Sequence, residues 1–368
     1  MTKKKTKKIS FVDKIIISVN LIFTFFLILA YLSVRISPSD VSLLALFGLV
    51  YVFLFAANLL FVVFWAIRKK WFFLISLIAI LIGYNLILNS FQINLFNQKA
   101  NSNSFKIMSY NVRLFNKYKW NKNNNTSSEI LYFIEKESPD VLCFQEYYSD
   151  QKDKNLFYHK KLTKLINYKD YYISFGKKGG QRYNYGIATY TKFPIISEGV
   201  IRYEDENDIS IFTDIVISED TIRLYNCHLQ SIKLGYEDYD FINNESNNNE
   251  EHKIVGLYRI IKKMNNAYEK RAEQVLIIKK HIKQCPYKVI VCGDFNDNPN
   301  SYVYNKISAN LDDAFKRSGQ GIGNTYIRDL SVFRIDYILH SKFIKSYNYK
   351  KHKVNYSDHY PISCEICM

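Results

Sequence analysis

Residues 289–300 read VIVCGDFNDNPN, and this stretch decides the fold class of the chain. A short apolar run reaches Gly293 and is followed at once by Asp294 and Asn296. Glycine, aspartate, asparagine and proline are ordinary turn residues, so a plain turn after a buried strand is one interpretation. The other is functional, because side chains alternate along a strand and Asp294 and Asn296 would then point to the same side. A carboxylate and an amide presented together suit the orientation of one water molecule and one anionic oxygen.

Short apolar runs alternate with helical stretches on both sides of this segment. Strands are predicted at residues 105–115, 141–146, 185–195, 209–218, 221–231, 288–294, 333–341 and 357–366, and helices at 127–140 and 253–284. This alternation, with several hairpins, predicts an α/β fold built as a four-layer αββα sandwich. Residues 236–251 are acidic and rich in asparagine, so we expect them to form an exposed loop.

Several of the predicted strands end in a residue that can take part in phosphate chemistry. These residues are Asn111, Glu146, His228, Asp294, Asn296, Asp336, Asp358 and His359. A single polar residue at a strand end is usually a turn or cap residue, but so many suggest strand ends that converge on one rim. Hard oxygen donors without partnered cysteines favour Mg²⁺ or Mn²⁺ over a closed zinc site, with Glu146 and Asp358 as plausible ligands.

The six cysteines do not suggest a metal or redox centre. Cys143, Cys227 and Cys292 each lie in an apolar, strand-like run, as small buried hydrophobic residues do. Cys364 and Cys367 form a C-x-x-C, but on a strand they would point to opposite faces and could not form a disulfide.

The motifs resemble those of the endonuclease/exonuclease/phosphatase superfamily. In chain order they are MSYNVRLF, PDVLCFQE, YGIATYTKFPI, YNCHLQS, VIVCGDFND, FRIDYIL and SDHYPI, within residues 105–368. The superfamily includes pancreatic deoxyribonuclease, the abasic-site endonucleases, inositol polyphosphate 5-phosphatases and neutral sphingomyelinases. The resemblance implies a metal-dependent hydrolase of phosphoester bonds.

The resemblance also implies a role for each matched residue. Asn111 and Glu146 would sit at the metal, with Asp358 assisting. Asp294 would orient or deprotonate the attacking water, and Asn296 would hold the transition-state oxygen. His359, paired with Asp336, would act on the water or bind the scissile phosphate, and His228 would be a second histidine facing the phosphate.

Three uncharged segments precede this region, at residues 15–34, 41–67 and 71–91. Each has the ~20 residues that a helix needs to cross a bilayer, so we expect three transmembrane helices, with residues 1–91 as a membrane segment and 92–104 as a tether. A signal peptide is the alternative for the first segment, but no small-residue cleavage site follows it.

Lysines crowd the chain before residue 15, and Arg68, Lys69 and Lys70 lie between the second and third segments, whereas the first loop has only Arg35 and Asp40. The positive-inside rule therefore places the N-terminus in the cytoplasm and the catalytic domain outside it. Of the net charge of +16, residues 1–104 carry +9 (nine lysines and two arginines against two aspartates), which leaves +7 on the remainder. This remainder would suit a polyanionic substrate or an anionic membrane.

Three functions remain open at this point. The first is a membrane-anchored phosphodiesterase or phosphatase, and the second is an extracytoplasmic nuclease. Residues 177–185 (KKGGQRYNY) are a candidate basic, aromatic loop for nucleic acid, whereas no apolar loop for lipid is obvious. The third is a catalytically silent, membrane-tethered binding protein, which the intact motifs disfavour. The expected partner is a phosphoester substrate, with nucleic acid or a lipid headgroup as options, and no obligate protein partner is inferred.

Overall fold

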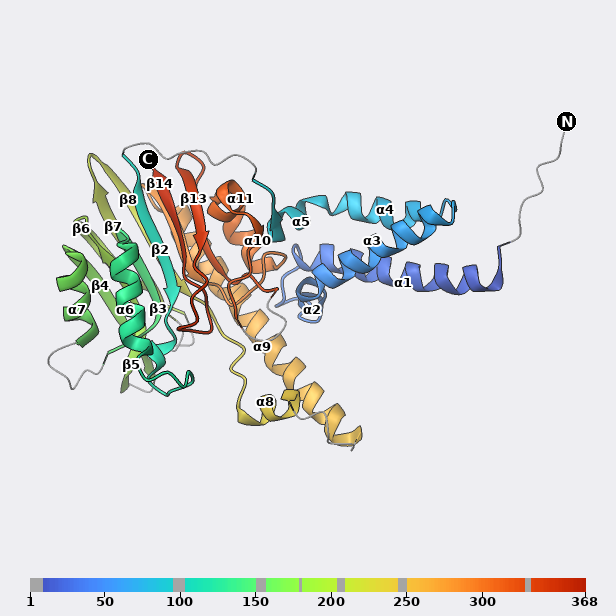
Figure 1. The fold of residues 1–368 in the computed structure, drawn as a ribbon, viewed down its shortest axis with the longest axis horizontal. Helices are drawn as coiled ribbons and strands as arrows, with labels where there is room; N and C mark the ends of the chain where they lie inside the picture. The colour runs from blue at the N-terminus through green and yellow to red at the C-terminus, as the bar shows by residue number, and fades with distance from the viewer. Residues whose placement is uncertain are drawn as a thin grey trace.

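The computed structural model describes residues 9–94, 103–149, 157–178, 181–203, 209–243, 250–327 and 332–368. A group of helices precedes residue 91, and a layered sandwich of two sheets begins at Phe105 (Figure 1). The two parts extend in different directions along the long axis of the molecule (Figure 1).

The first six-stranded sheet has the order β13-β14-β2-β3-β5-β4. Its strands are β2 (Phe105–Asn111), β3 (Val141–Tyr148), β4 (Asp170–Lys178), β5 (Gln181–Thr191), β13 (Lys345–Lys351) and β14 (Ile362–Cys367). Only β2 and β3 pair in parallel, with Asn111 opposite Gln145, so both strands end at the same edge.

The second six-stranded sheet has the order β10-β12-β9-β8-β7-β6. Its strands are β6 (Ile195–Ile201), β7 (Ile209–Ile217), β8 (Asp220–His228), β9 (Lys288–Asp294), β10 (Leu311–Asp313) and β12 (Asp336–Ser341). Here β8 and β9 form the parallel pair, with His228 opposite Asp294. The antiparallel neighbour β12 places Asp336 opposite Asp294 as well.

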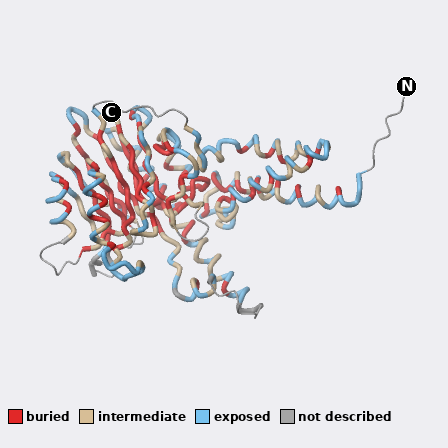
Figure 2. The backbone as a smooth tube through the Cα atoms, in the orientation of Figure 1, coloured by how far each residue is buried: buried red, intermediate tan, exposed pale blue. Residues whose placement is uncertain are grey.

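Three apolar cores separate four layers. The central core joins the inner faces of the two sheets, for example Ile107 and Cys143 with Leu224, Cys292 and Ile338. A second core packs α6 (Thr126–Glu137) and α7 (Phe157–Ile166) against the outer face of the first sheet. A third packs α9 (Glu250–Lys283) and α10 (Tyr302–Ser308) against the second sheet. The buried backbone in Figure 2 follows these layers, and the predicted αββα arrangement is confirmed.

Several predicted boundaries were wrong for local reasons. The strand predicted at 105–115 ends at Asn111, because Arg113–Asn116 turn with positive φ angles. The strand predicted at 333–341 begins only at Asp336, and the closing strand only at Ile362. The expected loop at 236–251 instead begins with a helix, α8 (Tyr236–Asn243), and ends in the first turn of α9; residues 244–249 lie outside the described residues. The middle of the 177–185 loop also lies outside them.

The helices before residue 91 bury a network of polar side chains as well as an apolar cluster around Leu27 and Leu54, and they expose many large apolar side chains. These helices are α1 (Phe11–Ser33), α2 (Leu44–Leu49), α3 (Tyr51–Ile67), α4 (Phe73–Ile82) and α5 (Tyr84–Ser90). Asn20 donates to Ser76 (2.6 Å), and both Thr24 and Ser76 donate to Asn58 (2.9 and 2.8 Å). All four are buried, whereas large apolar residues such as Leu60 (70 % exposed) face outward. Polar contacts between helices with an apolar exterior are typical of helices packed in lipid.

Within the described residues, one helix, α1, is long and apolar enough to cross a membrane. A second span is possible if the bent pair α4 and α5 counts as one. The uninterrupted second and third spans that the sequence predicts are not found. The second divides at Val50 into α2 and the 17-residue α3, and the third bends by 66° at Gly83 between α4 and α5. Apolar composition reports which residues avoid water, but it does not report where a helix breaks.

The end of this helical bundle contacts the sandwich directly. The Asn89 side chain donates a hydrogen bond to the backbone oxygen of Pro299 (3.2 Å) and accepts one from Lys316 (2.8 Å). The backbone oxygen of Asn89 accepts a hydrogen bond from Arg334 (2.9 Å). Strand β1 (Phe91–Gln92) pairs with β11 (Gly321–Ile322), so the start of the predicted tether is held against the sandwich. Residues 95–102 of the tether lie outside the described residues.

Candidate active site

The parallel strand pairs bring the predicted site residues to one edge of the sandwich. Asn111 and Glu146 come from the ends of β2 and β3 in the first sheet, and His228 and Asp294 from the ends of β8 and β9 in the second. Gly293 makes the last of these placements possible, because a Cβ atom there would lie 2.0 Å from the backbone oxygen of Cys227 and its φ of +131° favours glycine. The glycine before Asp294 is therefore a packing requirement of the β8–β9 pair.

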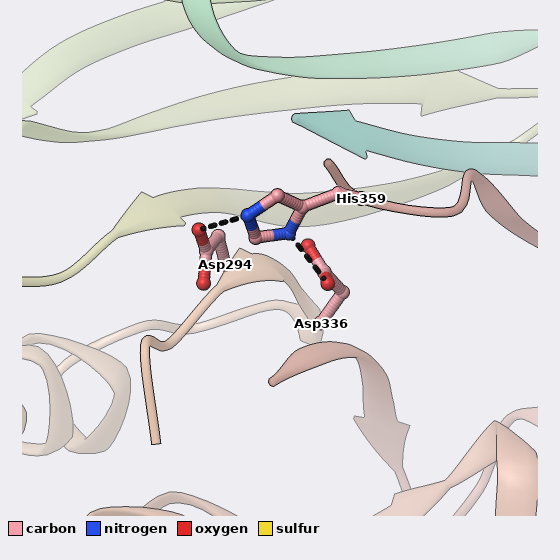
Figure 3. A group of neighbouring side chains, drawn as sticks. All are labelled: Asp294, Asp336 and His359. Carbon is pink, nitrogen blue, oxygen red and sulfur yellow. Dashed lines mark hydrogen bonds and ion pairs between the residues drawn. The ribbon is translucent and has the colours of Figure 1, made fainter. Parts of the chain in front are cut away.

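His359 lies between two buried carboxylates (Figure 3). Its Nδ1 atom is 3.0 Å from Asp336 Oδ2, and its Nε2 atom is 3.7 Å from Asp294 Oδ2. Burial by itself lowers the pKa of His359, but the carboxylates of Asp336 and Asp294 outweigh it and hold that pKa well above 6.5. Burial raises the pKa of Asp294, an effect that His359 opposes. The imidazolium is thus a fixed cation between two acids.

Asn111, Glu146 and His228 lie on the other side of Asp294. The Asn111 Nδ2 atom donates both to Asp294 Oδ2 (2.9 Å) and to Glu146 Oε1 (3.2 Å). His228 Nε2 is 3.8 Å from Glu146 Oε1 and 3.9 Å from Asp294 Oδ2, and it has no hydrogen-bond partner. Glu146 has a φ of +50° within an irregular stretch of the β3–β5 pairing, and such a bulge redirects a side chain. The side chain of Glu146 remains 32 % exposed.

Asn296 reaches the site by a turn and not by strand alternation, so that part of the prediction was wrong. Strand β9 ends at Asp294, and Asn296 has a φ of +52°. Its backbone N–H donates to Asp294 Oδ1 (2.8 Å), which closes an Asx turn. Its side-chain Nδ2 donates to the backbone oxygen of Leu229 (2.9 Å), so the amide ties the β9 turn to the end of β8.

Asp358 lies at the opening of the site beside residues that the sequence analysis did not single out. Its Oδ2 atom is 3.3 Å from Arg113 Nε, and Arg113 in turn stacks on Trp120 at 4.3 Å. Ser357 donates to the backbone oxygen of Asn111 (2.8 Å), which connects the SDH segment to β2. A cavity of about 480 Å³ lies here, lined in part by Arg113, Trp120, Lys122 and Asp358.

Thr325 is another missed residue, and it supports Asp336. Its Oγ1 atom accepts from the backbone N–H of Asp336 (3.1 Å) and of Ile335 (3.0 Å). Tyr326, the next residue, forms a β-bridge with His359 and packs edge-on against its ring. Nothing in the sequence around Thr325 marks it, because its partners are 10 and 11 residues further along the chain. Of the residues that were not predicted, only Arg113 could have been found from the sequence, because it lies two residues after Asn111.

The donor set at this edge fits a divalent cation. Four carboxylates meet there, those of Glu146, Asp294, Asp336 and Asp358. Arg113 and protonated His359 neutralise two of them, so negative charge remains. The exposed Glu146 carboxylate, beside the Asn111 amide, leaves room for the water ligands that Mg²⁺ keeps.

The trio Asp294, Asp336 and His359 also offers ligand atoms within 4.8 Å of one another. It is the poorer Mg²⁺ site, because the imidazole already fills the space between its buried carboxylates.

We expect His359 to stay protonated at neutral pH in metal-free protein. Asp336→Asn should lower its pKa, because burial remains while the nearest carboxylate is lost. A raised folded-state pKa stabilises the fold below the unfolded value of ~6.5 and ceases to do so as pH rises through the folded value. The stability gap between wild type and Asp336→Asn should therefore shrink at alkaline pH. Histidine-labelled NMR titration with EDTA measures the pKa, and a wild-type value at or below ~6.5 would contradict the assignment.

Comparison with solved structures supports this fold. An endonuclease/exonuclease/phosphatase family protein from Leptotrichia buccalis is 20 % identical, with a TM-score of 0.51 over 72 % of this chain and 100 % of its own. One from Bacteroides thetaiotaomicron is 16 % identical, with a TM-score of 0.53 over 72 % and 97 %. The human Nocturnin catalytic domain is 18 % identical, with a TM-score of 0.51 over 74 % and 96 %. At these identities the likeness concerns the fold alone.

Comparison with curated proteins gave no match. Two family models match different parts of the chain. A domain of unknown function (DUF8431) matches residues 13–90, the helical bundle. The model described as the endonuclease/exonuclease/phosphatase family matches residues 108–359, which is more than half of the chain. The chain therefore belongs to the endonuclease/exonuclease/phosphatase family.

Proposed function

We propose that this protein is a membrane-embedded, divalent-metal-dependent hydrolase of phosphate esters. The observation that carries the proposal is the row of acids and imidazoles at one edge of the sandwich, in which His359 bridges Asp336 and Asp294 while Asn111 joins Asp294 to Glu146. The same row argues against a silent binding protein, because a binding surface has no need to bury charged groups at this cost.

The proposed roles follow from these contacts. Asp294 orients the attacking water and accepts its proton, since the Asn296 backbone and the Asn111 amide hold its two oxygens. His359, kept cationic by Asp336, stabilises negative charge on the phosphate oxygens. His228, whose Nε2 atom lacks a partner, is placed to donate to the same phosphate. Asn296 positions the loop through Leu229 and presents its remaining amide N–H to an oxygen of the transition state.

We assign the cation, Mg²⁺ or Mn²⁺, to Glu146 and Asn111, with Asp358 at the opening. When bound, such an ion polarises the phosphoryl oxygen and stabilises the charge that develops on it. The Asn111 N–H₂ group, between Glu146 and Asp294, occupies the position of a positive partner in the metal-free arrangement. Rotation of this amide would turn its oxygen toward the ion.

We further propose that residues 1–91 form the membrane segment and that residues 92–104 connect it to a catalytic domain at 105–368. The bundle would cross the membrane three times, through α1, through the shorter α3 together with α2, and through the bent pair α4 and α5. The support is the packing of the bundle, which has a buried Asn20–Thr24–Asn58–Ser76 network and an apolar exterior. At its far end Asp13 pairs with Arg68 (2.7 Å) and Lys70 (2.8 Å). The basic residues around this end favour a cytoplasmic position, which puts the catalytic domain outside.

The substrate is a phosphoester whose class the site chemistry leaves open. The cavity beside Asp358 carries Arg113, Lys122 and Trp120, a combination that suits a phosphate next to a ring or an apolar group. Nucleic acid and a lipid headgroup both meet this description.

Glu146→Ala, Asp294→Ala and His359→Ala should each lower turnover by ~10²–10⁴-fold, the usual contribution of acid–base and electrostatic groups. Circular dichroism and thermal unfolding should show that each variant remains folded. Asp220→Ala is the matched control, because this carboxylate makes only an exposed ion pair with Lys288. Near-normal turnover in any of the three site variants would remove the assigned residue from the mechanism.

Removal of the cation should abolish hydrolysis. We expect EDTA to stop turnover of a chromogenic phosphodiester or phosphomonoester and added Mg²⁺ or Mn²⁺ to restore it. Glu146→Gln should raise the Mg²⁺ concentration needed for half-maximal activity, because it removes the charge of the proposed main ligand. Unchanged activity in a sample shown by elemental analysis to be metal-free would refute the metal dependence.

The topology predicts the behaviour of reporters fused after Met368. Alkaline phosphatase should be active and green fluorescent protein dark, because three crossings from a cytoplasmic N-terminus place the C-terminus outside. A fusion after Arg35 should behave as external and one after Lys69 as internal. The reverse pattern at Met368 would show that the number of crossings is even.

A further inference from the structure

A helical arm projects from the sandwich next to the active site. It consists of α8 and the N-terminal half of α9, and hereafter we call it the arm. The C-terminal half of α9 covers the second sheet through Ala272, Val275 and Ile278. A helix of 34 residues is ~50 Å long, so its N-terminal half extends well beyond the sheet.

The arm has a defined packing of its own. Gly256 lets the Phe241 ring approach closely, since a Cβ atom there would lie 2.4 Å from two ring carbons. Asp238, which is buried, pairs with Arg259 (3.0 Å) and Lys263 (2.5 Å). These contacts hold α8 on one face of α9, so the opposite face has a fixed direction.

That opposite face is apolar and uncovered. Ile254, Leu257 and Tyr258 are 68 %, 55 % and 67 % exposed, and Ile261 follows at helical spacing. Val255 (57 % exposed) extends the patch. Lys253 and Lys262 are exposed in the same part of α9. An apolar stripe with basic residues at its borders is typical of helices that lie in a membrane interface. The patch lies on a helix and not on an apolar loop, so the absence of an obvious apolar loop in the sequence did not exclude it.

The direction of the arm identifies what covers this face. Along the long axis of the molecule, the free end of α9 passes beyond the sandwich on the side of the bundle and reaches the level of α2 (Figure 1). Bundle residues near this level are themselves apolar and exposed, such as Leu43 (55 %) and Leu88 (44 %). The surface of a bilayer around the bundle would therefore lie at the level of the free end of α9.

The base of the arm is joined to the active site. Arg271 of α9 is buried, donates to the backbone oxygen of Gln230 (2.9 Å) and pairs with Asp297 (3.3 Å). Gln230 lies two residues after His228, and Asp297 lies three after Asp294. Gln274 of α9 also accepts from the Gln230 backbone N–H (3.0 Å). A surface that binds the arm therefore also fixes the distance between that surface and the catalytic edge.

We propose that the arm lies in the headgroup region of the membrane that contains the bundle, with Ile254, Leu257 and Tyr258 in contact with lipid. This inference rests on the proposed membrane embedding of the bundle. The protein then has two contacts with one leaflet, the transmembrane bundle and the interfacial arm. Two contacts fix the tilt of the catalytic domain, which a single tether would leave free.

Site-specific labelling of the full-length protein in liposomes tests the proposal. Single cysteines replace Leu60 on the bundle, Ile254 on the arm, or Lys280 at the other end of α9, in a background with Cys285→Ser and Cys367→Ser. Each cysteine carries an environment-sensitive NBD fluorophore. The vesicles contain phosphatidylcholine and phosphatidylglycerol, with nitroxide lipids as quenchers. We expect a blue shift and quenching of the emission at positions 60 and 254, and neither change at position 280. At position 254, a nitroxide at the level of the headgroups should quench more strongly than one deeper in the bilayer.

The outcomes separate the arm from the rest of the proposed function. Quenching at 60 without quenching at 254 overturns the arm contact and leaves the membrane bundle intact. A blue shift at 254 without lipid quenching means that protein covers the arm, such as a second copy, and also overturns it. No quenching at 60 refutes the embedding on which the inference rests. None of these readouts depends on hydrolysis, and Tyr258→Cys provides a second label should the Ile254 variant fold poorly.

Discussion

The placement of one imidazole between two buried carboxylates is the constraint on which the site depends. Asp294 and Asp336 are each 1 % exposed, and burial of two such acids without a cation is strongly unfavourable. His359 supplies the positive charge, but it comes from the segment before β14, in the opposite sheet. His359 can therefore compensate the two buried acids only when the two sheets have stacked, so sheet stacking and the charge balance of the site depend on each other.

Residues with unusual backbone conformations surround this centre. Arg113, Glu146 and Asn296 all have positive φ angles, although none is glycine. Such residues persist only where the surrounding contacts determine them, and they concentrate at functional sites. Here each one turns a side chain or an N–H group toward the edge where the strands end. The sandwich supplies the rigid frame, and these three positions direct the functional groups.

The bundle differs from the sandwich in the polar groups that it buries and in the apolar groups that it exposes. The sandwich buries aliphatic side chains between its layers, whereas the bundle buries a network of asparagine, serine and threonine beside its apolar cluster and exposes many large apolar side chains. The two parts meet at Asn89, whose partners include Arg334 and Pro299. Arg334 also forms a buried ion pair with Asp313 (2.7 Å) and lies two residues before Asp336. Loss of one partner from such a buried pair costs ~3–5 kcal/mol because it leaves an unpaired buried charge, so Arg334 and Asp313 depend on each other next to the strand that carries Asp336.

The sequence by itself indicated the layers of the sandwich and the polar residues that gather at one edge of it. Apolar runs that end in Asn111, Glu146, His228 and Asp294 indicate both the strands and the polar groups at their ends, because burial and strand alternation are local properties. All eight predicted side chains lie at the same edge.

Only the tertiary structure decided how these groups relate. It set the pairing of His359 with both acids, the turn that carries Asn296, the support from Thr325 and the direction of the arm. These features depend on contacts between residues far apart in the chain, or on where a helix bends, and no local pattern of hydrophobicity encodes either.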